Sequence, residues 1–210
     1  AKVNILILGG GGREHALAWA VLQNPKCDRL VVAPGNAGIA DIAECSNIDI
    51  LDPREILEFC EQNSIDFIIV GPEAPLASGV VDILKDAGFL VLGPRADAAR
   101  LETSKTFTKE ICDAAGAPTA GWARFTDAAA AHDHVAREGA PIVVKADGLA
   151  AGKGVVVAMT GEEAHAAIDD MLGGAFGEAG AAVVVEEFME GEEASLFVLC
   201  DGTDVLPVGT

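Results

Sequence analysis

A segment rich in glycine and lysine lies beyond the middle of the chain. It begins at Lys145, ends at Gly154, and contains Gly148, Gly152 and Lys153 between two apolar stretches. Small residues let a backbone close over a ligand, and a lysine at a strand end places a point charge on phosphate oxygens. A P-loop is rejected, because a strand follows and no Ser or Thr succeeds Lys153. The segment predicts a flap over a triphosphate; the alternative is a long hairpin with solvated lysines.

Carboxylates follow an apolar strand about forty residues later. The run Glu186-Glu187-Phe188-Met189 leads into a second acidic stretch that contains Glu193. Adenine requires an apolar slot and a backbone edge, and a nearby carboxylate can bind the ribose. Together with the flap and Lys145, this segment indicates a nucleotide site. Taken alone, an acidic strand exit is more often a solvated edge.

A glycine run joins the first apolar stretch to the first helical one. Gly10, Gly11 and Gly12 precede Arg13, so backbone N–H groups and a cation meet at a predicted helix start. A dinucleotide fingerprint would need a third glycine where Glu14 stands, and an acidic residue after the second strand, so bound NAD is the weaker interpretation. The loop predicts a site for a terminal phosphate. The alternative is a glycine-rich turn with a solvated arginine.

Three further loops follow predicted strands. Asn36 lies in the segment 33–38, Gly71-Pro72-Glu73 opens another loop, and a Gly-Pro pair occupies 93–94. Any one of them can be simple turn chemistry. Glu73 can accept hydrogen bonds from two ribose hydroxyls, so phosphate and sugar contacts together describe a phosphoribosyl ligand.

These loops are positioned by strands that alternate with helices. Apolar strands are expected at 3–8, 30–33, 67–70 and 90–92, and helices at 14–23, 53–63 and 76–87. The alternation predicts an α/β fold with a doubly wound parallel sheet, whose ligands bind beyond the carboxyl ends of its strands.

A second unit follows a helix at 104–115 and a Gly/Pro boundary at 116–121. We expect Thr126 to cap a helix to 138, and Thr160 with Glu163 to form a capping box. Strands are expected at 142–146, 155–159 and 182–187, and a hairpin turns at Asp201-Gly202 between 194–200 and 205–208.

The amino-acid composition limits the classes of molecule that the protein is expected to bind. Lys and Arg total 14 against 33 Asp and Glu, a formal net charge of -19, which disfavours nucleic acid and anionic membranes. No apolar run approaches the roughly 18 residues of a membrane span, and no signal peptide is visible, so we expect a cytoplasmic protein. The five scattered cysteines are expected in the core, and His132 and His134 are expected to be a solvated pair rather than metal ligands.

Five motifs in order, GGREHALAW, APGNAG, GPEAPL, KADGLAAGKGV and EEFMEGEEAS, resemble the phosphoribosylamine–glycine ligase family of the ATP-grasp superfamily. The resemblance covers the whole chain. It implies a pre-ATP-grasp domain over 1–100, a connecting helix and linker over 101–120 and a small ATP-grasp lobe over 121–190. The incomplete start of the large ATP-grasp lobe would occupy 191–210.

The resemblance also implies an activity. Glycine would be joined to 5-phosphoribosylamine through a glycyl phosphate, giving glycinamide ribonucleotide, ADP and phosphate in purine biosynthesis. The cofactors would be ATP and Mg²⁺ or Mn²⁺, and the family's metal ligands would lie beyond Thr210. We therefore expect an N-terminal fragment that is inactive alone and a monomeric full enzyme. The alternative is a non-catalytic module that binds a nucleotide or sugar phosphate.

The resemblance also implies the roles of individual residues. Lys145 would be catalytic, and Lys105 and Lys145 would contact the ATP phosphates. The full set expected at ATP is Lys105, Lys145, Gly148, Gly152, Lys153, Gly154, Glu186, Glu187, Phe188, Met189 and Glu193. The set expected at phosphoribosylamine is Gly10, Gly11, Gly12, Arg13, Glu14, Asn36, Gly71, Pro72 and Glu73.

Overall fold

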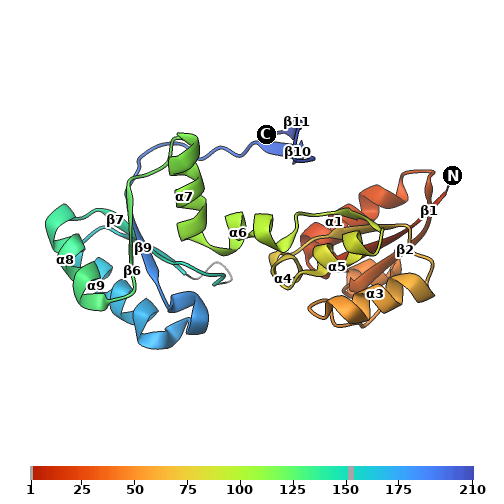
Figure 1. Ribbon diagram of the computed structural model, residues 1–210, viewed down its shortest axis with the longest axis horizontal. Helices are drawn as coiled ribbons and strands as arrows, with labels where there is room; N and C mark the ends of the chain where they lie inside the picture. Colours follow the sequence, from red (N-terminus) through yellow and green to blue (C-terminus); the bar gives the residue numbers. More distant parts are fainter. Residues whose placement is uncertain (1, 151–153) are drawn as a thin grey trace.

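The computed structural model describes residues 2–150 and 154–210 of the chain (Figure 1). Its first sheet has the strand order β3-β2-β1-β4-β5, and all four neighbouring pairs are parallel. The strands are β1 (Val3–Gly9), β2 (Cys27–Pro34), β3 (Glu44–Cys45), β4 (Phe67–Val70) and β5 (Leu90–Leu92). The predicted α/β class and doubly wound parallel sheet are confirmed.

Both faces of this sheet are buried. In β1, Leu6 and Leu8 join one apolar cluster with Ile56, whereas Ile5 and Ile7 join a second cluster on the opposite face. Alternate residues of a strand point to opposite faces, so helices must cover the sheet on both sides. The helices of this part are α1 (Gly12–Leu22), α2 (Ala37–Ala40), α3 (Pro53–Gln62), α4 (Glu73–Ala77) and α5 (Val80–Asp86).

The predicted helix at 76–87 is wrong as a single element. The chain forms α4 and α5 instead, and Gly79 between them has a φ of 85°, in the left-handed region that interrupts a helix. Because α4 starts at Glu73, this carboxylate sits in the first turn of a helix and at the end of β4.

Two helices connect the first sheet to the second (Figure 1). They are α6 (Ala96–Thr103), which the sequence did not predict, and α7 (Lys105–Ala115). Ser104 separates them in an extended conformation, and its hydroxyl accepts a hydrogen bond from the Phe107 N–H at 3.2 Å, which caps α7.

The second sheet is antiparallel and has the order β6-β9-β7-β8. Its strands are β6 (Trp122–Phe125), β7 (Ile142–Ala146), β8 (Val155–Ala158) and β9 (Val183–Glu187); β6 was not predicted. One face packs against α8 (Ala128–Glu138) and α9 (Gly161–Asp170), through Val135, Val144 and Ile168 among others. A π-helical turn (Met171–Ala175) and a 3-10 turn (Gly177–Gly180) precede β9.

The N-terminal caps of α8 and α9 test two predictions. The capping box of Thr160 and Glu163 at α9 is confirmed. The predicted cap at Thr126 is wrong, because Asp127 holds that position and its carboxylate accepts the Ala130 N–H at 2.8 Å. A carboxylate caps well, since it also interacts favourably with the helix dipole.

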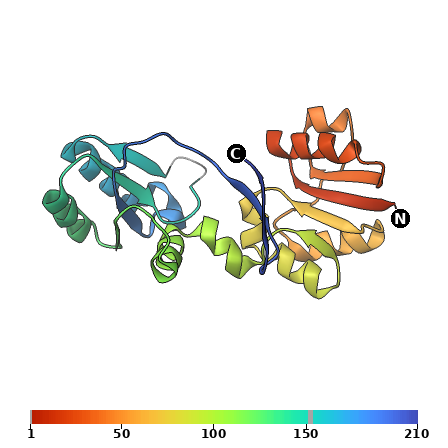
Figure 2. The same ribbon diagram turned by 90° about the horizontal axis from the view of Figure 1, so that it is seen from above.

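The last elements form the predicted hairpin, β10 (Phe197–Cys200) and β11 (Val205–Gly209), which is the dark blue pair of strands beside the C mark in Figure 2. Every residue of both strands is exposed. Among the described residues, no helix is both long and apolar enough to cross a membrane.

The prediction that the cysteines are core residues is only partly right. Cys60 is buried and Cys27 and Cys112 are half-buried, but Cys45 and Cys200 are exposed. Cys45 lies in the two-residue edge strand β3, and Cys200 lies in the exposed hairpin, so neither has a layer of structure above it.

Candidate functional site

The loops that follow β1, β2 and β4 meet at one edge of the first sheet. Asn36 donates through Nδ2 to the carbonyl of Gly10 at 2.9 Å, and the Gly35 N–H donates to the carbonyl of Gly9 at 3.2 Å. The strand order reverses between β1 and β4, which is where open α/β sheets bind ligands. The predicted convergence of these loops at one rim is therefore confirmed.

Glu14 organises this rim from below. It is buried, and its Oε2 accepts the Gly11 N–H at 2.7 Å. A Cβ at Gly71 would lie 2.7 Å from Cδ of Glu14, so the carboxylate occupies the space that a side chain would need there. The sequence predicted Glu14 as a ligand contact; the structure places it beneath the glycine loop, with one buried oxygen, Oε1, lacking a hydrogen-bond partner among the described residues.

Arg13 lies above Glu14 and reaches across the rim. Its Nη1 and Nη2 are each 3.3 Å from Oε1 of Glu73, and its Nε is 3.5 Å from Oε1 of Glu14. The Arg13 side chain is still 60% exposed, and a Cβ added at Gly12 would touch nothing within 4 Å. The exposed loop backbone and the guanidinium can thus face the same anion, with the Glu73 carboxylate beside it.

A second group of charged residues lies on the second sheet, on the face opposite α8 and α9. Lys145 pairs with Val184 in the register of β7 and β9, so Lys145 and Glu186 point from the same face. The Lys145 ammonium donates to Oε2 of Glu186 at 2.8 Å. The Lys145 side chain is 26% exposed, whereas that of Glu186 is 7% exposed.

Helix α7 supplies two more lysines, one turn apart. Lys109 Nζ is 3.2 Å from Oε2 of Glu186, and Lys105 Nζ donates to the carbonyl of Gly148 at 3.2 Å. Burial lowers the pKa of Lys105 from its ordinary value, and the ammonium of Lys145 lowers it further. Two lysines, Lys109 and Lys145, therefore contact the buried carboxylate of Glu186, and Lys105 lies one turn from Lys109 on α7.

These charges border a pocket of about 540 Å³ between α7 and the sheet. Among its lining residues are Lys105, Lys109, Lys145, Val155, Glu186 and Met189. Apolar walls with a few convergent polar groups are typical of small-molecule sites, and the cations select an anionic ligand. The pocket is suited to a nucleotide polyphosphate.

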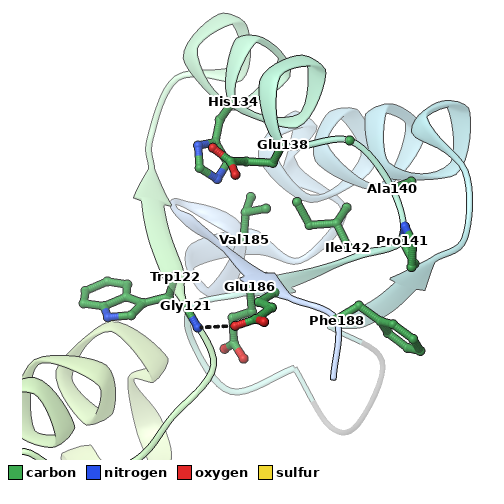
Figure 3. Close-up of a pocket in the computed structure, with 12 residues that line it drawn as sticks. Gly121, Trp122, His134, Glu138, Ala140, Pro141, Ile142, Val185, Glu186 and Phe188 are labelled. Carbon is green, nitrogen blue, oxygen red and sulfur yellow. Dashed lines mark hydrogen bonds between the residues drawn. The ribbon is translucent and has the colours of Figure 1, made fainter. Parts of the chain in front are cut away.

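A larger pocket, of about 620 Å³, lies at the other side of β9, near the end of α8 (Figure 3). Its lining includes His134, Glu138, Glu187 and Phe188, and Glu187 Oε2 accepts the Gly121 N–H at 3.2 Å. No lysine or arginine is among the described residues that line it, so its carboxylates disfavour a phosphate. Phe188, predicted to frame adenine, lies here and not beside the lysines.

The remaining predicted ATP contacts are scattered. Gly154 accepts the Ala146 N–H through its carbonyl at 2.8 Å, at the start of β8. Glu193 is exposed and lines neither pocket. Gly152 and Lys153 lie outside the described residues.

The histidines depart from their predicted role. His132 and His134 do point to different sides of α8, but the expected solvated pair is wrong. His132 contacts His165 of α9 at 2.6 Å between the Nδ1 atoms and Asp169 at 2.9 Å, and His134 packs against Phe125. Within residues 2–150 and 154–210, no group of three His, Cys, Asp or Glu side chains is arranged to hold a metal ion.

Sequence reasoning missed Lys109 and Asp147. Asp147 Oδ1 accepts the Thr106 N–H at 2.8 Å and the Ser104 hydroxyl at 3.3 Å, which ties the start of the flap segment to the start of α7. The four-residue spacing of Lys105 and Lys109 was the available signal, because such a pair shares one helix face.

Comparison with known families assigns the first sheet and the second sheet to two different family models. Residues 3–102 match the family model "Phosphoribosylglycinamide synthetase, N domain", and residues 103–210 match the model of the ATP-grasp (A) domain of the same synthetase. The chain belongs to the phosphoribosylglycinamide synthetase family. The resemblance inferred from the five motifs is confirmed.

Individual relatives are phosphoribosylamine–glycine ligases. The chain is 55% identical over 208 residues to the enzyme of Mesorhizobium japonicum, and 54% identical over 209 residues to that of Neisseria meningitidis serogroup A, covering 99% of this chain and 49% of each relative. The crystal structure of the Thermotoga maritima enzyme superposes with a TM-score of 0.79 at 27% identity, over 98% of this chain and 49% of that one. The chain thus spans about half the length of these relatives.

Proposed function

We propose that the protein contributes the phosphoribosylamine site and part of the ATP site of an enzyme that ligates glycine to 5-phosphoribosylamine. The observation that carries the proposal is the pocket between α7 and the second sheet, where Lys105 and Lys145 face one cavity. The glycine and arginine rim of the first sheet supplies a second anion site on the same chain.

The lysines would act on the phosphates of ATP. In this reaction a carboxylate oxygen of glycine attacks the terminal phosphorus, the bond to ADP breaks, and a glycyl phosphate forms. The Lys105 and Lys145 ammoniums hold the phosphate oxygens and oppose the negative charge that develops on them. The apolar wall at Val155 and Met189 leaves space for the base.

The rim would hold the acceptor. Its phosphate is expected at the N–H groups of Gly11 and Gly12 and at Arg13, with Glu73 accepting from ribose hydroxyls. The amine of phosphoribosylamine attacks the glycyl carbonyl carbon, phosphate leaves, and the amine loses a proton as the amide forms. The metal ligands that the family resemblance implies would lie beyond Thr210, and the steps above describe only what the residues of this chain would do.

The experiment measures ADP release by the protein extended to the length of its relatives, with glycine and phosphoribosylamine each added and omitted. We expect release only with both substrates. Lys145→Ala should abolish it, whereas Lys26→Ala, which removes an equal charge from an exposed site, should not.

Two results would contradict the proposal. Unchanged turnover in Lys145→Ala would remove that lysine from the site. Saturable ATP binding with no turnover under any of these conditions would instead favour a non-catalytic nucleotide-binding module.

A further inference from the structure

Lys109 is a buried lysine with a complete set of partners. Its side chain is 9% exposed. The ammonium donates to Thr119 Oγ1 at 2.7 Å and to the carbonyl of Ala120 at 3.2 Å, and it lies 3.2 Å from Oε2 of Glu186. An ammonium has three N–H donors; two of them are hydrogen-bonded to Thr119 and Ala120, and the charge is paired with Glu186. Lys109 cannot turn toward a ligand without abandoning one of these partners.

Lys145 is held differently. It contacts the same oxygen, Oε2 of Glu186, at 2.8 Å, and in the described part of the chain this carboxylate is its one hydrogen-bond partner. Its side chain is also about three times as exposed as that of Lys109. Among the described residues, two of the three Lys145 N–H donors therefore have no protein acceptor, and the side chain is open to solvent on one side.

The carboxylate of Glu186, which contacts both Lys109 and Lys145, determines whether Lys145 can bind a ligand phosphate. A buried charge that loses its partner is strongly destabilised, so Glu186 alone would retain Lys145 and oppose its movement to a phosphate. Lys109 also contacts Glu186, so it would still pair with this carboxylate if Lys145 moved. The carboxylate then keeps a counter-ion whether or not a nucleotide is bound.

We propose that Lys109 is a positioning residue that permanently neutralises Glu186, and thereby frees Lys145 to bind the phosphates of a nucleotide. This inference rests on the nucleotide site of the proposed function. It assigns Lys109 no contact with the nucleotide. Its effect should accordingly appear in the affinity for phosphates and not in the affinity for adenosine.

The test compares the binding of ATP and adenosine by calorimetry, using the protein extended to the length of its relatives, as in the activity assay. The measured quantity is the affinity for ATP divided by the affinity for adenosine, because an altered contact with the adenine base changes both affinities equally. Lys109→Met should lower the ratio by about tenfold or more, since one ion pair then competes with the phosphates for Lys145. Lys109→Arg, which keeps the charge, should hold the ratio within about threefold of the wild-type value.

A double variant separates this mechanism from direct attraction and from misfolding. Lys109→Met with Glu186→Gln removes both buried charges, so neither is left unpaired and Lys145 has no competing carboxylate. Its ratio should return to within about threefold of the wild-type value. If Lys109→Met alone does not fold, the ratio of the double variant still tests the inference.

Three results would overturn the inference. A double variant that keeps the tenfold loss means that Lys109 attracts phosphate directly. An equal loss for ATP and adenosine in Lys109→Met means a structural role. If the wild-type chain binds neither compound, the nucleotide site of the proposed function fails as well, whereas the first two results leave that site standing.

Discussion

Replacing Gly71 with alanine should damage the rim of the first sheet through one identifiable collision. The added Cβ would lie 2.7 Å from both Cγ and Cδ of Glu14, a distance that real Cβ atoms do not adopt. The Glu14 side chain is buried beneath the loop, so it has little room to retreat. Its movement would break the 2.7 Å hydrogen bond to the Gly11 N–H.

The expected cost combines two effects. Loss of a hydrogen bond to a charged group costs about 1.5–3 kcal/mol. Forcing an extra carbon into a filled site costs about 1–3 kcal/mol, so the free energy of unfolding should fall by about 3 kcal/mol or more. The matched control is Gly12→Ala, whose Cβ would meet nothing within 4 Å and which should be neutral or slightly stabilising.

The assay is urea unfolding monitored by hydrogen exchange of peptides from β1 and β4, so that the stability of the first sheet is measured separately from that of the second. Gly71→Ala should also lose protection at the Gly11 amide. In a Glu14→Ala background the same change should cost much less, because the colliding atoms are gone. If Gly71→Ala is as stable as Gly12→Ala, the packing argument for the rim is refuted.

Three other predictions concern separate parts of the molecule. Burial holds the pKa of Lys105 below the usual 10.5, so its ammonium loses its proton at a lower pH than that of a free lysine. A bound triphosphate raises this pKa, so ATP binding should take up protons and the affinity for ATP should fall as the pH rises through this range. In calorimetric titrations, Lys105→Arg should remove this fall in affinity. Burial raises the pKa of Cys60 to about 12, so iodoacetamide should modify the exposed Cys45 in the folded chain and spare Cys60, as read by mass spectrometry; equal labelling would contradict the assigned core. Asp127→Ala should destabilise α8 by about 1 kcal/mol in hydrogen exchange and Thr126→Ala should not; the reverse order would restore Thr126 as the cap.

Much of the first sheet could be predicted because its strands are short runs of branched apolar residues. The run Phe67–Val70 matches β4 residue for residue, and parallel connections then require the loops after β1, β2 and β4 to share one edge. The break at Gly79 could not be predicted, because a glycine within helical spacing is tolerated and only its positive φ reveals the interruption.

The lysine pocket was predicted only in part. Lys145 lies in a motif, and Lys105 was assigned through the family resemblance. A lysine on a helix is ordinarily solvated, so the four-residue spacing from Lys105 was too weak a signal to assign Lys109. Its burial depends on the register of β7 and β9, which places Glu186 beneath α7. Phe188 follows β9 and lines the pocket near α8, not the lysine pocket, and its predicted contact with adenine stays a prediction.

The central claim is that the pocket between α7 and the second sheet binds nucleotide phosphates through lysines. The most direct measurement is a crystal structure of the protein, extended to the length of its relatives, with a non-hydrolysable ATP analogue. We predict phosphate oxygens within hydrogen-bond distance of Nζ of Lys105 and Lys145, with Lys145 turned from Glu186 and Lys109 still against it. An analogue in the pocket of Glu138 and Glu187, or a Lys145 that contacts Glu186 and no phosphate, would contradict the claim.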